Sequence, residues 1–318
     1  MRTRLLTLAL PLLVAAGLPA SAVEPTARPD SPVLNIAHRG ASGLAPEHTI
    51  AAYDLGLALG ADLIEQDAQL TADGVLVALH DATLDRTARG PAENCTGRVA
   101  TKTLAQLRTC DVGTWFNERY PDRARPEFAG ARIPTMSEVF SRYGDGVAYH
   151  VEIKDGDPRS VRELLRLLDV HGLRDDAHTS WRVLLQSFNP ADLLLARTLD
   201  PALPTVQLLA AAPPAGPARD VLLDRVATYA DGVGPSAGGV DAAFVQAAHA
   251  RCLQVHPYTV DDADRLRALV DAGVDGVFTN RPDVLDEVLF PDRSQVRAED
   301  AGVRNAAAAA GRSRDCNG

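Results

Sequence analysis

The sequence predicts an α/β fold: a TIM (β/α)8 barrel with an inserted segment over one of its mouths. Eight short apolar runs alternate with stretches of helical periodicity. Several of these stretches begin at Asp, Ser or Pro and end at Gly, as helix caps require. Strand followed by helix, repeated in this way, is typical of a closed parallel barrel with its helices outside. A doubly wound open sheet shows the same alternation and is the alternative.

The expected strands are short, and they follow one another at intervals that leave room for helices. They lie at 33–38, 62–67, 148–154, 183–188, 205–209, 232–236, 253–260 and 276–280. The helical stretches lie at 47–60, 160–172, 190–199, 241–252 and 263–273. After the second strand, the Asp73-Gly74 step favours a tight two-residue hairpin, so the chain is expected to turn back beside that strand.

The start of the chain is expected to be removed during export. Residues 1–22 combine a basic start, an apolar run and small residues up to Ala22, which predicts a signal peptide cleaved after Ala22 and therefore a secreted protein. Residues 23–32 are Pro-rich and are expected to be a linker. No later hydrophobic segment is long enough to predict a stable membrane span.

The barrel itself is expected to occupy 33–290, with one interruption. Residues 85–134 are rich in Gly, Pro and Arg and show little periodicity, so they are expected to form the insertion. Residues 291–318 are polar and of low complexity, which predicts a C-terminal tail.

Charge and cysteine content narrow the possible partners. The net charge of -10 argues against a nucleic-acid partner, because phosphate backbones are held by clustered Lys and Arg. Four cysteines in an exported chain predict disulfides. Cys95 and Cys110 bracket a short loop and are the first candidate pair. Cys252 and Cys316 are the second.

Two carboxylates on the second strand point to a site. Residues two apart in a strand share a face, so Glu65 and Asp67 are expected to face the barrel interior together. Burying two like charges is costly unless a cation lies between them. If Asp73 and Gly74 form the hairpin loop, residue 72 pairs with 75, and His80 comes opposite or nearly opposite Asp67. Two carboxylates and an imidazole are therefore expected at one mouth.

Further polar residues follow other strands and are expected at the same mouth, because catalytic groups of such barrels come from the carboxyl ends of several strands. Three carboxylates suit a hard divalent cation, and two basic residues suit an anionic substrate such as a phosphate. Two histidines are the natural acid and base near neutral pH. The residues added by this reasoning are His38, Arg39, Glu47, Glu152 and Lys154.

Four stretches taken together resemble the glycerophosphodiester phosphodiesterase family, of the secreted bacterial type. They are "HRGASGLAPEHT", "ADLIEQDAQLTADGVLVALHDATLDRT", "VEIK" and "GVDGVFTNRPD", in the order the family has them. The resemblance implies an acid-base pair, three metal ligands, two phosphate-binding residues and a supporting carboxylate. These are, in the same order, His38 and His80; Glu65, Asp67 and Glu152; Arg39 and Lys154; and Glu47.

One position departs from the family pattern, which usually has Asn where His48 stands. This puts the hydrogen bonding at that helix start in doubt, but not the metal site. The histidines other than the acid-base pair are expected to be structural or solvent-facing. They are His48, His150, His171, His178, His249 and His256. Asp81 is expected to orient a neighbour.

The expected function is a secreted, metal-dependent hydrolase that cuts glycerophosphodiesters to an alcohol and glycerol 3-phosphate, by attack of water or of the glycerol's neighbouring hydroxyl. Calcium is favoured over magnesium as the cation, because an exported protein meets more of it and an open site suits its larger coordination number. One alternative is a lysophospholipase D or sphingomyelinase D-like hydrolase on the same barrel. Its apolar landing surface would be Val112, Trp115, Phe116 and Tyr120. The other alternative is a noncatalytic barrel that serves as a binding module.

Overall fold

The computed structural model describes residues 33–174 and 181–291. The expected signal peptide and linker lie outside the described residues, as do His178, Cys316 and all but the first residue of the expected tail. The proposed pairing of Cys252 with Cys316 therefore has one partner outside this part of the chain.

Eight parallel strands form the barrel in the described part of the chain. Neighbours pair in the order β8-β7-β6-β5-β4-β2-β1-β9. The two ends of this sheet meet, because the Asp275 N–H donates to the Val255 carbonyl and the Phe278 N–H to the Pro257 carbonyl, both at 3.0 Å. The predicted barrel is thus confirmed, and the doubly wound open sheet is wrong. The strands are β1 (Leu34–Ala37), β2 (Leu63–Leu70), β4 (Ala148–Ile153), β5 (Val183–Ser187), β6 (Thr205–Leu209), β7 (Gly232–Pro235), β8 (Gln254–Val255) and β9 (Gly276–Thr279).

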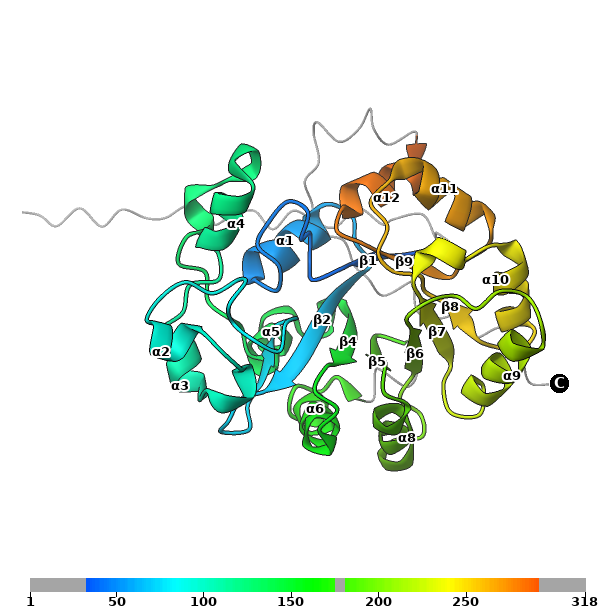
Figure 1. The fold of residues 1–318 in the computed structure, drawn as a ribbon, viewed down its shortest axis with the longest axis horizontal. Helices are drawn as coiled ribbons and strands as arrows, with labels where there is room; N and C mark the ends of the chain where they lie inside the picture. The colour runs from blue at the N-terminus through cyan, green and yellow to red at the C-terminus, as the bar shows by residue number, and fades with distance from the viewer. Residues whose placement is uncertain (1–32, 175–180, 292–318) are drawn as a thin grey trace, which may run out of the picture.

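Helices follow the strands and cover the outside of the barrel (Figure 1). Most begin at a side chain that accepts a backbone N–H of the first turn, as Thr49, Asp157, Asn189, Asp241 and Asp262 do. The helices outside the insertion are α1 (Ile50–Ala58), α5 (Met136–Tyr143), α6 (Pro158–Val170), α8 (Pro190–Leu199), α9 (Pro217–Val226), α10 (Ala242–His249), α11 (Ala263–Asp271) and α12 (Pro282–Leu289). No helix in the described residues has the length and apolarity that crossing a membrane requires.

Side chains on the two faces of a strand pack into different hydrophobic clusters. A large cluster between strands and helices contains Ile64, Tyr149 and Leu185, whereas a smaller one contains Leu63 and Ala148. Side chains alternate between the faces of a strand, so the smaller cluster fills the barrel interior. The residues that continue this inner face along the strands are polar: Glu65 and Asp67 on β2, His150 and Glu152 on β4, and Gln186 on β5. The sequence therefore builds an apolar floor under a polar mouth.

The hairpin after β2 differs from the expected one by a single residue. β3 (Leu76–Ala78) pairs antiparallel with β2, and Leu70 lies opposite Leu76. The Thr71 N–H donates to the Val75 carbonyl, so the loop has three residues, ending at Gly74 with φ 79°. The predicted pairing of residues 72 and 75 is wrong. Glycine adopts this left-handed backbone without a steric cost, which allows the longer loop.

As a result of this shift, Leu79 and not His80 lies opposite Asp67, and its N–H donates to the Asp67 carbonyl at 2.9 Å. His80 follows at the next position, beyond the end of β3, and its side chain reaches the same mouth. The expected meeting of His80 with the acidic pair therefore occurs, but from a loop rather than from a paired strand.

The last part of the expected strand 253–260 is irregular. Only Gln254–Val255 forms β8, although the N–H groups of His256 and Tyr258 still donate to carbonyls of β7. Pro257 has no N–H to contribute to a strand ladder, so regular pairing ends before it.

The insertion, 85–134, contains short helices beside α1 and β2 (Figure 1). They are α2 (Ala92–Cys95), α3 (Leu104–Leu107) and α4 (Thr114–Arg119). Cys95 and Cys110 form a disulfide in this segment. The guanidinium of Arg123 donates to the Gly43 carbonyl in the loop after β1, at 2.5 Å, which ties the insertion to that rim of the barrel.

The apolar landing surface that the lysolipid alternative requires is not formed in this insertion. Trp115 and Phe116 pack with Phe128 and with the α1 face, and Val112 belongs to a second small core. All three are buried, and only Tyr120 is exposed, at 37 %. Burial of these aromatic rings stabilises a segment that has little other regular structure.

Candidate active site

The site lies at the carboxyl ends of the strands, where a cavity of about 240 Å³ opens. Six of the residues predicted from sequence line it: His38, Arg39, Glu65, His80, Glu152 and Lys154. Asp67 and Glu47 lie behind this lining and contact it through Arg39. The structure therefore brings all eight predicted residues together, from β2, β4 and the segments that follow β1, β3 and β4.

The three carboxylates are buried close to one another, which raises the pKa values of two of them. Burial and the charges of Asp67 and Glu152 raise the pKa of Glu65 well above its usual range. Burial and the charge of Asp67 raise the pKa of Glu152 to about 8, against the opposing charge of Lys154. The pKa of Asp67 is held well below its usual range, because a hydrogen bond from His48 and the charges of Lys154 and Arg39 outweigh its burial.

Two basic side chains offset part of this charge. Lys154 Nζ lies 2.9 Å from Glu152 Oε1 and 3.6 Å from Asp67 Oδ1. Arg39 Nε lies 3.5 Å from Asp67 Oδ2 and has no hydrogen-bond partner despite being buried. Both side chains, Arg39 and Lys154, line the cavity, so they are placed to attract an anionic group that enters it.

Arg39 occupies a backbone conformation that few side chains adopt. Its φ is 58°, and the next residue, Gly40, has φ 79°. This turn points the Arg39 N–H at Glu65 Oε2, 2.7 Å away. It also brings Gly40 so close to α1 that a Cβ there would lie 2.5 Å from the carbonyl carbon of Ala52. The glycine of the HRG stretch is therefore required twice, for its φ and for this close approach.

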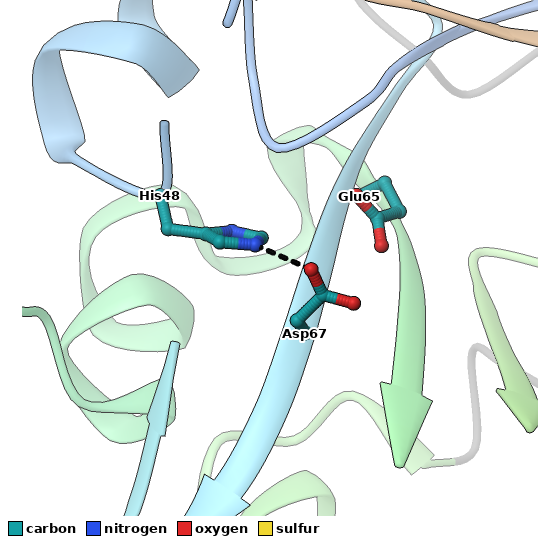
Figure 2. Close-up of side chains that lie close together, drawn as sticks. All are labelled: His48, Glu65 and Asp67. Atoms are coloured by element: carbon teal, nitrogen blue, oxygen red, sulfur yellow. Dashed lines mark hydrogen bonds and ion pairs between the residues drawn. The ribbon is translucent and has the colours of Figure 1, made fainter. Parts of the chain in front are cut away.

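His48 lies in the site and not merely near it, which the sequence does not predict. Its Nε2 lies 2.7 Å from Asp67 Oδ2 (Figure 2), and its Nδ1 lies 3.0 Å from the Tyr53 hydroxyl. An ionised carboxylate only accepts hydrogen bonds, so Nε2 of His48 carries the proton and donates it to Asp67. His48 therefore orients Asp67 and has no lone pair on that nitrogen to offer a metal.

The donor set fits a divalent cation. Ligand atoms of His48, Glu65 and Asp67 come within 4.8 Å of one another (Figure 2). Glu152 lies outside that group but lines the same cavity. Carboxylate oxygens are the ligands that calcium and magnesium prefer, and a cation among them would relieve the repulsion that raises the pKa of Glu65. The residues that would hold it are Glu65, Asp67 and Glu152, with His48 behind Asp67.

His38 is fixed by a residue from the far end of the chain. Its Nδ1 lies 2.7 Å from Asn280 Oδ1, just after β9. Asn280 Nδ2 donates to Asp261 Oδ2, so its oxygen faces the imidazole and Nδ1 of His38 carries the proton. Nε2 is then left with a lone pair. Burial, together with the charge of Arg39, lowers the pKa of His38 to about 4.

His80 has a different kind of partner. Its Nδ1 lies 2.7 Å from Asp81 Oδ1, so a carboxylate and not a neutral amide accepts from the ring. Burial lowers the pKa of His80, with Arg39 and Lys154 adding to this and Asp67 and Asp81 opposing it. As predicted for Asp81, it orients its neighbour. Nε2 of His80 is the ring nitrogen that is not bonded to Asp81, and it carries a proton only when the whole ring is protonated.

Glu47 is held by two arginines. It accepts from Arg39 at 3.1 Å and from both terminal nitrogens of Arg86 at 2.7 Å. The arginine hydrogen bonds and charges outweigh its burial and lower its pKa to about 2. Sequence reasoning missed Arg86 and Asn280. Both stand inside stretches that drew attention, but nothing local in the sequence indicates which distant side chains they meet.

Part of the cavity lining is less polar. It is formed by Phe188, Leu208, Tyr258 and Phe278, and the Phe188 and Tyr258 rings meet at 5.9 Å. Gln186 lines the cavity beside Glu65. Its Nε2 donates to Glu65 Oε1 at 3.5 Å, and its own Oε1 is buried without a hydrogen-bond partner. A ligand in this cavity therefore meets basic side chains, carboxylates and apolar side chains.

A (β/α)8 barrel with this arrangement at its strand ends defines the class of protein, a hydrolase that acts on an anionic substrate. Residues 38–284 match the model of the Glycerophosphoryl diester phosphodiesterase family, and the chain belongs to that family. It is therefore an enzyme, a glycerophosphodiester phosphodiesterase.

Named relatives agree with this assignment. The chain is 41 % identical to the glycerophosphodiester phosphodiesterase of Bacillus subtilis over 258 residues, which cover 80 % of this chain and 86 % of the relative. It is 34 % identical to the corresponding enzyme of Caldanaerobacter subterraneus over 256 residues, 79 % and 96 % of the two chains. An Oleispira antarctica phosphodiesterase, solved in complex with the product sn-glycerol-3-phosphate, has a similar fold. Its TM-score is 0.65 at 28 % identity, with 80 % of this chain and 95 % of that chain covered.

Proposed function

We propose that the enzyme hydrolyses glycerophosphodiesters to an alcohol and glycerol 3-phosphate, with His38 and His80 as the acid-base pair and one divalent cation. One observation carries the proposal: the Nδ1 of each imidazole is bonded to a partner, which leaves Nε2 for chemistry, and both histidines line the cavity together with two carboxylates and two basic side chains. The sn-glycerol-3-phosphate bound to the Oleispira relative supports the product.

The partners of the two histidines assign their roles. His38 faces a neutral amide and its pKa of about 4 leaves it uncharged at neutral pH, so its Nε2 can take the proton of the attacking hydroxyl. His80 faces the carboxylate of Asp81, which supports the protonated ring, so His80 gives its proton to the leaving alcohol oxygen. A bond from the attacking oxygen to phosphorus forms, and the bond from phosphorus to the alcohol oxygen breaks.

The charged side chains hold the phosphate. Arg39 and Lys154 neutralise charge on its oxygens. Arg39 Nε is buried and has no hydrogen-bond partner, so a substrate would not have to displace one. A bound divalent cation supplies further positive charge at the phosphate and makes phosphorus more electrophilic. The size of the cavity suits a small polar head and leaves a long acyl chain outside, so the lysolipid alternative is not favoured.

We propose calcium as the cation, because three carboxylates in an open, exported site suit its larger and more flexible coordination shell. The test is metal removal by EDTA followed by titration with calcium or magnesium at matched concentrations. Activity should return with calcium. Restoration by magnesium alone, with inhibition by calcium, would contradict the choice of ion while leaving its ligands in place. Full activity in EDTA would contradict metal dependence.

Substitution of His80 tests the chemistry directly. Loss of a general acid lowers turnover on the order of 10²-fold or more, so His80→Ala should fall by that amount on glycerophosphocholine. His171→Ala is the matched control, because His171 pairs with Ser137 outside the site. Turnover of His80→Ala within a few-fold of the control would remove His80 from the mechanism. No hydrolysis by the parent with either cation would indicate the noncatalytic binding module.

We also propose that the protein is secreted after cleavage following Ala22. The sequence of residues 1–22 motivates this, and the disulfide between Cys95 and Cys110 supports it, since such bonds persist mainly in oxidising compartments. Intact mass of protein recovered from the medium should correspond to a chain that begins at Val23. Recovery of the uncleaved chain from the cell interior would contradict the proposal.

A further inference from the structure

Arg86, in the insertion, forms hydrogen bonds with two carboxylates of the site at once, those of Asp81 and Glu47. Its Nε donates to Asp81 Oδ2 at 2.6 Å and one terminal nitrogen to Asp81 Oδ1 at 3.1 Å. The same terminal nitrogen and the other one donate to the two oxygens of Glu47, each at 2.7 Å. One guanidinium thus spans two carboxylates, which stand 34 positions apart in the sequence as Glu47 and Asp81.

Each of these carboxylates holds a different functional residue. Asp81 accepts from Nδ1 of His80 at 2.7 Å, and Glu47 accepts from Arg39 at 3.1 Å. His80 belongs to the acid-base pair and Arg39 to the phosphate-binding pair. A displacement of Arg86 therefore affects both residues, through one bond each.

Arg86 is not itself placed to bind substrate. Its hydrogen bonds to Glu47 and Asp81 occupy both edges of the guanidinium and leave a single N–H. Its charge is offset by two carboxylates, each with a pKa of about 2. It does not line the cavity, and the ring of Trp115 lies 5.4 Å from its central carbon.

The insertion fixes the position of Arg86. Trp115 is buried against Phe116 and the α1 face, so the ring beside the guanidinium cannot move freely. The contact adds a cation–π attraction that holds the guanidinium plane. The insertion is therefore linked mechanically to the mouth of the barrel.

We propose that Arg86 is a positioning residue of the reaction, which holds His80 through Asp81 and Arg39 through Glu47 in one fixed arrangement. This rests on the proposed function of His80 and Arg39. A displacement of about 1 Å in a catalytic group can cost 10²-fold in rate, so the arrangement matters even though Arg86 touches no substrate.

The charges around His80 give the proposal a signature other than rate. Besides burial, the charges that act on the pKa of His80 are those of Asp67 from β2, Arg39 from the loop after β1 and Lys154 from the end of β4, and Asp81 on its own segment accepts from its Nδ1. Arg86 neutralises Asp81. Without Arg86, the uncompensated carboxylate stabilises the protonated imidazole, so the pH limb that reports His80 moves to higher pH.

The experiment compares Arg86→Gln and Arg86→Lys in the full-length enzyme loaded with divalent cation. Arg108→Gln is the matched control, because Arg108 also lies in the insertion and pairs with a single carboxylate, Glu138, away from the site. Arg86→Gln should lose about 10²-fold in kcat with little change in KM, and its pH limb should move upward. Arg86→Lys should recover only part, since an ammonium cannot span both carboxylates. Arg108→Gln should keep the parent's kcat and pH profile.

A double-mutant cycle separates positioning from a loss of folding. Because Arg86 acts partly through Asp81, adding Arg86→Gln to Asp81→Asn should cost less than it costs the parent. Thermal unfolding of Arg86→Lys, which keeps the charge, checks that the fold survives. Three outcomes would overturn the proposal: kcat and pH profile of both Arg86 variants like those of Arg108→Gln, a rise in KM alone, or full additivity with Asp81→Asn. Undiminished activity of His80→Ala would instead overturn the proposed function, whatever Arg86 does.

Discussion

The role of base proposed for His38 depends on an acceptor for its Nδ1, and that acceptor is a side chain 242 positions away, Asn280. Asn280 is fixed in turn by Asp261, which accepts from its backbone N–H at 2.7 Å and from its side-chain nitrogen at 2.8 Å. At the scale of single residues, the site thus depends as much on these holding groups as on the groups that touch substrate.

Replacing Asn280 should therefore reduce turnover without touching the substrate. Asn280→Ala removes the acceptor from Nδ1 of His38, so the ring can rotate or carry its proton on Nε2, and kcat should fall by up to about 10²-fold. Steady-state kinetics on glycerophosphocholine measures this. Asn117→Ala is the control, since Asn117 bonds only within the insertion, to the backbone of Arg125. Equal kcat for the two variants would contradict the role given to Asn280.

His48 should affect metal binding in the same indirect way. His48→Ala leaves Asp67 without the hydrogen bond that orients it, and loss of such a partner lowers metal affinity by about 10-fold to 100-fold. Calorimetric titration with calcium measures the affinity. His249→Ala, which removes an imidazole paired with Asp275 instead, provides the comparison. An unchanged calcium affinity in His48→Ala would show that Asp67 needs no such orientation.

At the scale of elements, the hairpin of β2 and β3 and the insertion that follows it are held together by one small core. The disulfide between Cys95 and Cys110 lies inside a small core that also contains Val77 of β3 and Leu84. This core joins the hairpin to the insertion. The insertion has few regular elements of its own, so such links carry much of its order.

Removing this disulfide should lower stability measurably. The bond closes a segment of sequence separation 15, for which restriction of the unfolded chain is worth about 3 kcal/mol. The double substitution Cys95→Ser with Cys110→Ser should lower the free energy of unfolding in urea by about that amount. The reduced parent protein should behave alike. A difference from the oxidised parent of only a few tenths of a kcal/mol would mean that the small core, not the bond, holds the insertion.

At the scale of the whole molecule, the described residues bury a pair of uncharged histidines, His150 on β4 and His256 just after β8. His150 Nε2 lies 3.3 Å from His256 Nδ1, and His256 Nε2 lies 3.0 Å from Gln254. Burial lowers the pKa of His256 to about 4 and holds that of His150 well below its ordinary value. Each imidazole is thus buried in its neutral form, in line with the structural role expected from the sequence.

These histidines predict acid sensitivity of the whole fold. A histidine with a folded pKa below its unfolded value of 6.5 takes up its proton first in the unfolded chain. Stability is therefore complete above pH 6.5 and is lost as the pH falls toward 4. For His256 the full loss in the free energy of unfolding is on the order of 3 kcal/mol. Urea unfolding at pH 7 and at pH 4 should show that the free energy of unfolding falls less in His256→Gln than in the parent. An equal fall in the two proteins would contradict this.

The sequence by itself determines the barrel and the inner face of its strands. Both follow from periodicities that a few neighbouring residues define: strand and helix alternate, and residues two apart share a face. Glu65, Asp67 and Glu152 can therefore be placed at one mouth without coordinates. The pairing of Cys95 with Cys110 is equally local, because the two residues bracket one short loop.

Only the tertiary structure decides which side chains meet across that mouth. The contacts of Arg86 with Glu47, of His48 with Asp67 and of Asn280 with His38 each involve at least one loop residue, and loop paths follow no short period. The burial of Trp115 is likewise a matter of how the insertion packs. Even the hairpin register moves by one residue, because Gly74 makes a three-residue loop as accessible as a two-residue one. Local pattern fixes which face a residue occupies, whereas its partners depend on the free energy of packing the whole chain.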